Sequence, residues 1–308
     1  MTATWRDVPT GPQRIVCMTE ETTEWLYLLG QEHRIVGISG YTVRPRRARE
    51  EKPKISAFTS AKIDKILALQ PDCVLGFSDM QADIAAELVR RGVQVTIFNQ
   101  RSVTEIFSTL YQVATMVGQG AQGLERIATV QAHLTAIEKS VAQRVAAGAR
   151  RPRVYFEEWD EPPISAIRWV SELLDIAGGD DCFAELALAH GGKGRIIADR
   201  TEIVRRNPDI IIGSWCGKKF RPEHVAAREG WQVVNAVRHG QLFEIKSCDI
   251  LQPGPAALTE GVRQLHAVLC RAVGIDLPEA VRPAERWDDG AAAPRPTTTA
   301  APPAPPRP

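Results

Sequence analysis

Short apolar runs alternate with segments of helical periodicity along most of the chain. The runs are too short for helices, and they are typical of strands buried in a parallel sheet. Helical segments separate them, which favours an α/β fold. The predicted strands lie at residues 14–18, 35–38, 73–77 and 94–98 in the first part of the chain, and at 153–157, 210–214 and 242–245 in the second part.

Two segments of the first part recur in the second part, in the same order. Residues 23–30 and 171–178 each have a hydroxyl-plus-Glu start, an apolar helical body and a glycine stop. Residues 64–76 and 201–213 each contain a short helical segment, a Pro-Asp pair and an apolar run. The helix should end before the proline, because the residue preceding proline disfavours the α conformation. This duplication predicts two lobes of the same design.

Helical periodicity fills the middle of the chain at residues 102–118 and 122–147. We therefore expect two Rossmann-like α/β lobes joined by one long α-helix, with a ligand cleft between the lobes. A further helix at 255–273 should close the second lobe. The expected boundaries are 14–118 for the N-terminal lobe, 119–150 for the connecting helix, 151–274 for the C-terminal lobe, and 275–308 for a disordered tail rich in proline and alanine.

The composition excludes several classes of partner. Among 308 residues, 38 are basic and 37 acidic, so no global field favours nucleic acid. Residues 1–13 contain no apolar run, and the sequence as written predicts no signal peptide and a cytoplasmic location. The six cysteines stand singly, which suits reduced thiols. We expect a monomer.

Two motifs carry a family resemblance, namely Gly-Ile-Ser-Gly-Tyr at residues 37–41 and Leu-Gln-Pro-Asp at 69–72. With the order of strands and helices, they resemble the helical-backbone (class III) substrate-binding proteins of ABC importers, which take up cobalamin, iron siderophores or haem. The resemblance covers residues 14–274. It implies a binding protein rather than an enzyme, with no cofactor of its own and a corrinoid (cobalamin-like) ligand. A siderophore or haem is the alternative.

The resemblance also implies an ABC transporter permease as a partner. Cobalamin binders of this family place an acidic residue in each lobe where the permease docks. Those positions fall on Asp64 in the first lobe and on Thr201 in the second, with Glu202 beside it. Members of the family are exported, whereas this sequence predicts no export signal.

The candidate ligand-binding residues follow the predicted strands, because ligands of such folds sit at the carboxyl ends of the strands. Aromatic faces suit a flat macrocycle, and two of the aromatic residues match contact positions of the family, Tyr41 and Phe58. The candidates are Glu20, Tyr41, Phe58, Asp79 and Gln100 from the first lobe, and Glu158, Trp159, Trp215, Cys216, Lys218 and Asp249 from the second lobe.

Less specific interpretations stay open at these positions. The aromatic side chains could pack on their own lobe, and the acidic run 157–161 could be a solvated strand end. An enzyme on the same scaffold is a further alternative. It would use Cys216, whose thiol a nearby lysine could activate, or the carboxylates of Glu158 and Asp160. No histidine is tied to Cys216, and the histidines miss the strand ends, so we expect neither catalysis nor a direct metal site.

Overall fold

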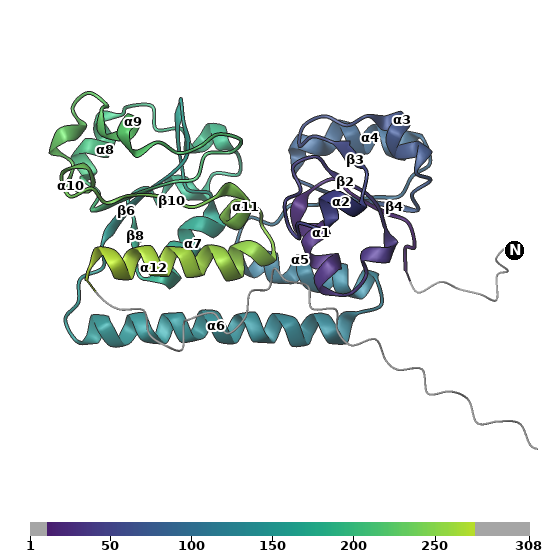
Figure 1. Cartoon of the computed structure of the whole chain (residues 1–308), viewed down its shortest axis with the longest axis horizontal. Coiled ribbons are helices and arrows are strands. Elements are labelled where there is room, and N and C mark those ends of the chain that lie inside the picture. Colours follow the sequence, from purple (N-terminus) through teal and green to yellow (C-terminus); the bar gives the residue numbers. More distant parts are fainter. Residues whose placement is uncertain (1–10, 275–308) are drawn as a thin grey trace, which may run out of the picture.

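The computed structural model describes residues 11–274, which form two α/β lobes standing side by side on a helical base (Figure 1). The expected fold class is therefore confirmed. The predicted disordered tail, 275–308, lies outside the described residues. So do residues 1–10, which make up most of the segment on which the prediction of a cytoplasmic location rests. Within residues 11–274, no helix is both long enough and apolar enough to cross a membrane.

Lobe one contains a five-stranded parallel sheet with the order β3-β2-β1-β4-β5. Its strands are β1 (Ile15–Cys17), β2 (Ile35–Ser39), β3 (Lys54–Ser56), β4 (Cys73–Phe77) and β5 (Val95–Phe98). Four of them were predicted, and β3 was not. Its helices are α1 (Glu20–Leu28), η1 (Glu32–Arg34), α2 (Ala48–Glu51), α3 (Ile63–Ala68), η2 (Asp79–Gln81) and α4 (Ala82–Arg90).

Lobe two contains a second sheet, with the order β10-β9-β6-β7 and with β8 paired to β6. Its strands are β6 (Arg153–Asp160), β7 (Pro163–Ser165), β8 (Asp180–Asp181), β9 (Ile210–Gly213) and β10 (Leu242–Glu244). Unlike the others, β7 runs antiparallel to its neighbour β6. The helices are α7 (Arg168–Ala177), η3 (Leu186–Leu188), η4 (Gly192–Arg195), α8 (Thr201–Arg206), α9 (Pro222–Ala226), η5 (Trp231–Val233), α10 (Asn235–Arg238) and α11 (Ser247–Ile250).

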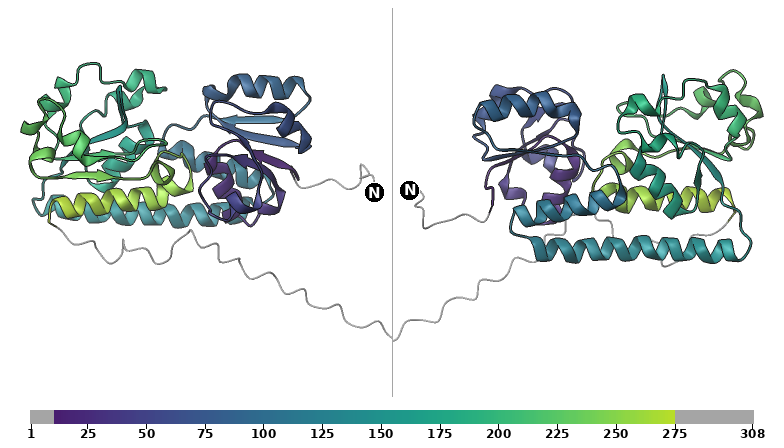
Figure 2. Two further views of the ribbon diagram at one scale, coloured as in Figure 1. Left: turned by 45° about the horizontal axis from the view of Figure 1, so that its top comes forward. Right: turned by 180° about the vertical axis from the view of Figure 1, so that it is seen from behind.

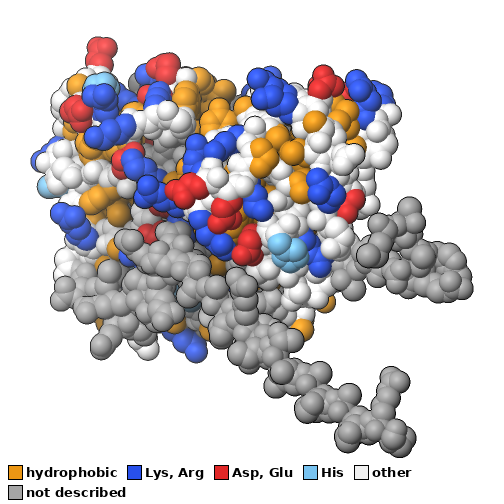
Figure 3. All heavy atoms as spheres, turned by 45° about the vertical axis from the view of Figure 1, so that its right-hand side comes forward, with side chains coloured by type: hydrophobic (Ala, Val, Ile, Leu, Met, Phe, Trp, Pro, Cys, Tyr) orange, Lys and Arg blue, Asp and Glu red, His pale blue; other side chains and the backbone are white. Residues whose placement is uncertain are grey.

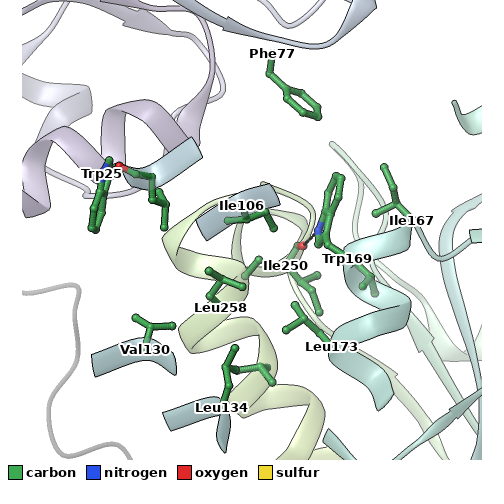
Figure 4. Packing of buried hydrophobic residues seen from close by; sticks show 14 of the residues in the cluster. Trp25, Phe77, Ile106, Val130, Leu134, Ile167, Trp169, Leu173, Ile250 and Leu258 are labelled. Carbon is green, nitrogen blue, oxygen red and sulfur yellow. Dashed lines mark hydrogen bonds between the residues drawn. The ribbon is translucent and has the colours of Figure 1, made fainter. Parts of the chain in front are cut away.

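The duplicated segments occupy equivalent places in the two lobes. The first pair forms α1 and α7, and the second pair forms α3–β4 and α8–β9. Strand β4 pairs with β1, just as β9 pairs with β6. Each of α1 and α7 carries a buried tryptophan whose indole N–H donates to a distant backbone carbonyl, from Trp25 to Leu110 at 2.7 Å and from Trp169 to Ile250 at 2.9 Å (Figure 4). These hydrogen bonds satisfy the polar atom of each large apolar side chain.

The helical base consists of α5 (Val103–Met116), α6 (Gly120–Ala146), the π-helical turn η6 (Ala257–Gly261) and α12 (Val262–Ala272). Helix α6 runs beneath both lobes (Figures 1 and 2), and its buried stripe contains Ile127, Val130, Leu134, Ile137 and Val141. Leu124 and Val145, at the two ends of the periodic apolar series that predicted this helix, are exposed. Ser102 and Glu105 form a capping box that starts α5. Helix α5 packs against α1, α6 and α7, and so it also bridges the lobes. The lobes therefore meet through more than the one helix expected.

Candidate functional site

Aromatic side chains from both lobes meet where strand β4 ends. The Phe77 ring lies edge-on to the Trp169 ring of lobe two, with 6.4 Å between the ring centroids and an interplanar angle of 76° (Figure 4). The ring centroid of Phe77 also lies 6.5 Å from that of Phe58. We call these three residues the aromatic floor. It brings the predicted ligand residue Phe58 to the junction of the lobes.

Polar contacts hold residues 253–256, which follow α11 of lobe two, against lobe one. Gln100 Nε2 donates to the carbonyl of Pro253 at 3.0 Å, and the amide of Ala256 donates to Glu24 Oε2 at 3.1 Å. Gln100 is buried, and its Oε1 has no hydrogen-bond partner. The structure therefore places Gln100, predicted as a ligand contact, in a seam between the lobes.

Asp249, another predicted ligand residue, also belongs to this seam. Its Oδ1 lies 3.4 Å from Arg44 Nη1 of lobe one, and its Oδ2 accepts a hydrogen bond from Gln264 at 3.0 Å. Arg44 also pairs with Glu24 at 2.8 Å. Asp249 thus has partners within the protein, which sequence could not reveal because Arg44 is 205 positions away.

Helix α1 starts with two buried carboxyl groups. Burial raises the pKa of Glu20, and burial raises the pKa of Glu21 to about 8. The Thr19 hydroxyl donates to Glu21 Oε1 at 2.5 Å, whereas Oε2 is buried without a hydrogen-bond partner. Gly254 packs so closely that a Cβ there would lie 2.4 Å from the Cβ of Glu21. Glu21 therefore belongs to the seam, and the predicted ligand residue Glu20 is buried beside it at the start of α1.

A buried ion pair organises the wall of lobe two. Glu157 is fully buried and accepts two hydrogen bonds from Arg228, at 2.6 and 2.8 Å. It also accepts from the Trp215 indole at 3.1 Å and from the Tyr155 hydroxyl at 2.9 Å. Trp215 is only 6% exposed and packs on Phe220. The expectation that its indole opens into the cleft is corrected: Glu157 supplies the indole partner inside the core.

Trp159 and Lys218, both predicted ligand residues, contact each other. The Lys218 ammonium lies 4.3 Å from the Trp159 ring centroid and 5.0 Å from the Trp215 ring centroid. It also pairs with Asp160. A cation over an indole face is attracted by the ring quadrupole, so Lys218 holds Trp159 in position. The Trp159 side chain stays partly exposed.

The geometry does not support the alternative of an enzyme that uses Cys216 or the carboxylates of Glu158 and Asp160. Arg195 engages both oxygens of Glu158, at 2.6 and 2.9 Å, and Lys218 engages Asp160. Cys216 is exposed, and partial desolvation by its neighbours together with the charges of Glu158 and Glu20 raises the pKa of its thiol, which disfavours the thiolate. Within residues 11–274, no group of three or more His, Cys, Asp or Glu side chains is placed to hold a metal ion.

The remaining predicted residues lie on the surface. Tyr41 is 57% exposed at the end of β2, and the Asp79 side chain is 86% exposed after β4. Of the two docking candidates, Asp64 is exposed on α3. Glu202 instead accepts hydrogen bonds from Arg205 and Arg206. Its carboxylate is therefore already paired within α8.

Sequence reasoning missed the arginines that complete this site, namely Arg44, Arg101, Arg195 and Arg228. Arg101 could have been found, because it directly follows Gln100 at the end of β5. Its guanidinium lies over the Phe77 ring, 4.8 Å from the centroid. It lines a groove together with Ile167 and Arg168 of lobe two, so it too faces the other lobe. Arg195 ends the four-residue 3-10 helix η4 and Arg228 lies in a bend after α9, and neither short segment carries a periodic signal.

Comparison with known sequences gives a consistent picture. A family model described as periplasmic binding protein matches residues 15–248. The chain is 22% identical over 261 residues to an uncharacterized ABC transporter substrate-binding lipoprotein of Bacillus subtilis, covering 82% of this chain and 79% of that protein. It is also 22% identical over 257 residues to a vitamin B12-binding protein of Vibrio parahaemolyticus, covering 80% and 86%.

Solved structures share the fold. The periplasmic vitamin B12-binding protein of Vibrio cholerae superposes with a TM-score of 0.67 at 20% identity, covering 86% of this chain and 99% of that chain. A periplasmic haem-binding protein of Pseudomonas aeruginosa superposes with a TM-score of 0.72 at 19% identity, covering 85% and 94%. Both proteins are described as periplasmic, so the comparisons give the cytoplasmic prediction no support.

Proposed function

The chain belongs to the periplasmic binding protein family, and on that premise we propose that it binds a corrinoid reversibly in the cleft between its lobes. The observation that supports this proposal is the aromatic floor of Phe58, Phe77 and Trp169, which joins the two lobes. Phe77 and Trp169 are buried and back this junction, whereas Phe58 and Trp159 are partly exposed and can present apolar faces to a flat macrocycle. Trp159 adds a further indole on the wall of lobe two.

The polar groups around the floor suit binding rather than chemistry. The carboxylates of Glu158 and Asp160 are each paired to a cation, and the Cys216 thiol has a raised pKa. Neither arrangement supplies a free base or a ready nucleophile. We therefore propose a role in ligand capture, without catalysis.

Delivery to an ABC transporter permease is part of the proposal. The B. subtilis relative is described as a substrate-binding lipoprotein of such a transporter. In this chain, exposed Asp64 is the better docking candidate, because Glu202 is paired with Arg205 and Arg206. The charged side chains on the face shown in Figure 3 are of both signs and interspersed, and no single-sign surface for nucleic acid is seen there.

A titration tests the ligand class. Cobalamin, cobinamide, haemin and ferric siderophores are each added to the protein while the emission of its seven tryptophans is recorded. Cobalamin or cobinamide should bind and quench that emission. Tighter binding of haemin or a siderophore would favour the alternative ligand class. An absence of binding to all of them, confirmed by calorimetry, would refute the proposal.

A matched pair of variants locates the site. Trp159→Ala should weaken corrinoid binding about fivefold, because an aromatic contact contributes about 1 kcal/mol beyond its buried area. Tyr111→Ala removes a partly exposed aromatic side chain from α5 and should leave binding unchanged. Equal effects of the two changes would contradict the placement of the ligand.

A further inference from the structure

A groove of about 260 Å³ lies beside the aromatic floor, and both lobes contribute to its wall. Its polar and charged members are Asn99, Arg101 and Glu105 from lobe one and Arg168 and His190 from lobe two, with Ile167 between them. None of the eleven residues predicted to bind ligand lines this groove. The groove therefore offers a ligand polar groups that the aromatic floor lacks. The two places meet at Arg101, which stacks on Phe77.

Arg101 is the central cation of the groove. Its side chain is only 13% exposed, and its guanidinium stacks on Phe77 of the floor. Asn99 Oδ1 accepts a hydrogen bond from it at 2.9 Å, whereas the nearest carboxylate oxygen, from Asp79, lies 3.4 Å away. The Asp79 side chain is 86% exposed, so water screens this pair strongly. Arg101 Nε is buried and has no hydrogen-bond partner.

The other carboxylates near Arg101 already accept hydrogen bonds from other groups. Glu105 Oε2 accepts hydrogen bonds from the amides of Arg101 and Ser102 at the start of α5. Glu172 accepts from Arg168 at 2.9 Å and from the amide of Val103 at 2.7 Å. These carboxylates are held by backbone amides, and neither can turn toward Arg101 without uncapping α5. A largely buried guanidinium therefore faces the groove with incomplete compensation of its charge.

The charge around Arg101 also comes from lobe two. Arg195 and Glu158 form a bidentate pair there, and the two charges largely cancel at a distance. Arg168, whose Nε already donates to Glu172, and His190 also line the groove from lobe two and have further N–H groups that could donate to an anion. An anion placed in the groove would therefore meet donors from both lobes.

We propose that this groove holds an acidic substituent of the ligand, a carboxylate or a phosphodiester, while the macrocycle lies in the adjoining cleft between the lobes. The inference rests on the proposed function and specifies the ligand as anionic at one edge. Stacking on Phe77 fixes the plane of the guanidinium, and this plane suits bidentate recognition of an oxyanion. Because the wall comes from both lobes, the acidic group would bind best when the lobes keep the present spacing.

Two ligand pairs provide the probe. Haemin carries two carboxylates that its dimethyl ester lacks, and cobalamin carries a nucleotide loop with a phosphodiester, whereas cobinamide lacks the whole loop. Affinities for all four are measured with the wild type, Arg101→Met, Arg101→Lys and Arg90→Met. Methionine keeps an unbranched stem over Phe77 and removes the charge. Arg90 is the control, because it is 72% exposed on α4 of the same lobe.

In at least one pair, the wild type should prefer the acidic member. Arg101→Met should reduce affinity for that member about tenfold or more, the effect of losing one charged hydrogen-bonding partner, and leave the neutral member unchanged. Arg101→Lys should recover part of the loss, and Arg90→Met should change nothing. Inorganic phosphate at millimolar concentration should compete weakly, because it lacks the macrocycle.

Other results would overturn the inference. Equal loss of both members in Arg101→Met would show that Arg101 only supports the aromatic floor through Phe77. Unchanged affinity for every ligand would show that the groove is not used. Strong competition by phosphate alone would assign the groove to a free anion instead of a substituent. If the wild type bound none of the four ligands, the proposed function itself would fail, and this inference with it.

Discussion

Arg228→Met tests how the wall of lobe two is held together. Arg228 is the only cation among the described residues that pairs with Glu157, and it engages both carboxylate oxygens. Glu157 has no exposed surface. Removing Arg228 would leave a fully buried charge supported only by the Trp215 indole and the Tyr155 hydroxyl.

The expected cost follows from that burial. Breaking a buried ion pair by removing one partner costs about 3–5 kcal/mol, because the remaining charge has lost both water and its counter-ion. Chemical denaturation followed by circular dichroism measures the free energy of unfolding. The control is Arg205→Met, which removes an ion pair with Glu202. The Arg205 side chain is 73% exposed, so this change should cost about 0–1 kcal/mol of unfolding free energy.

A second variant isolates the cause. In Arg228→Met/Glu157→Gln the uncompensated charge is gone, and an amide oxygen can still accept from the Trp215 indole. The double variant should therefore be more stable than Arg228→Met alone, which is a favourable coupling between neighbours. If Arg228→Met cost less than about 1 kcal/mol, or if the double variant were the less stable one, the electrostatic explanation would be refuted.

Further predictions concern pH, packing and motion. Burial raises the pKa of Glu21 from 4.5 to about 8, so its contribution to stability is complete below pH 4.5 and is lost as pH rises through about 8. Glu21→Gln should flatten this alkaline loss in denaturation curves, and an unchanged pH profile would contradict the assignment. Burial lowers the pKa of His266 below 6.5, so stability should fall as pH drops below 6.5, whereas His266→Gln should remove that acid-side slope. Leu134→Ala in the buried stripe of α6 should cost about 2–5 kcal/mol, whereas Leu124→Ala on its exposed face should cost less than about 1 kcal/mol, both measured by urea denaturation. Saturating ligand should change the radius of gyration in small-angle scattering only slightly. Helix α6 is continuous over 27 residues and resists bending, and the seam holds the lobes together at a second place. A large compaction on ligand binding would show that the connection between the lobes is not stiff.

The elements that sequence predicted well are those with a strong local signal. The apolar runs of β4 and β9 follow Pro-Asp pairs, and the buried stripe of α6 repeats at three- and four-residue steps. Strand β3 was missed because Lys54–Ser56 contains a single apolar residue. Strand β7 was missed because it begins at a proline, which usually argues against a strand.

Within the site, local position predicted which residues follow the strands but not what they contact. Tyr41 and Trp159 lie near strand ends with part of their side chains exposed, as the pattern indicated. Trp215 has the same local pattern, yet it is buried, because Glu157 of a neighbouring strand accepts its indole hydrogen. Such partners are fixed by packing between distant segments and leave no periodic trace in the sequence.

The seam also has a consequence for synthesis of the chain. Glu24 on α1, which pairs with Arg44 of its own lobe, also accepts a hydrogen bond from the amide of Ala256, which lies 232 positions later and is synthesised long after lobe one. Until then, lobe one would hold the carboxyl groups of Glu21 and Glu24 without the segment that covers them. The first lobe made therefore depends on the last segment made, and a chain truncated before residue 253 should be retained by chaperones or degraded rather than accumulate as a stable single lobe.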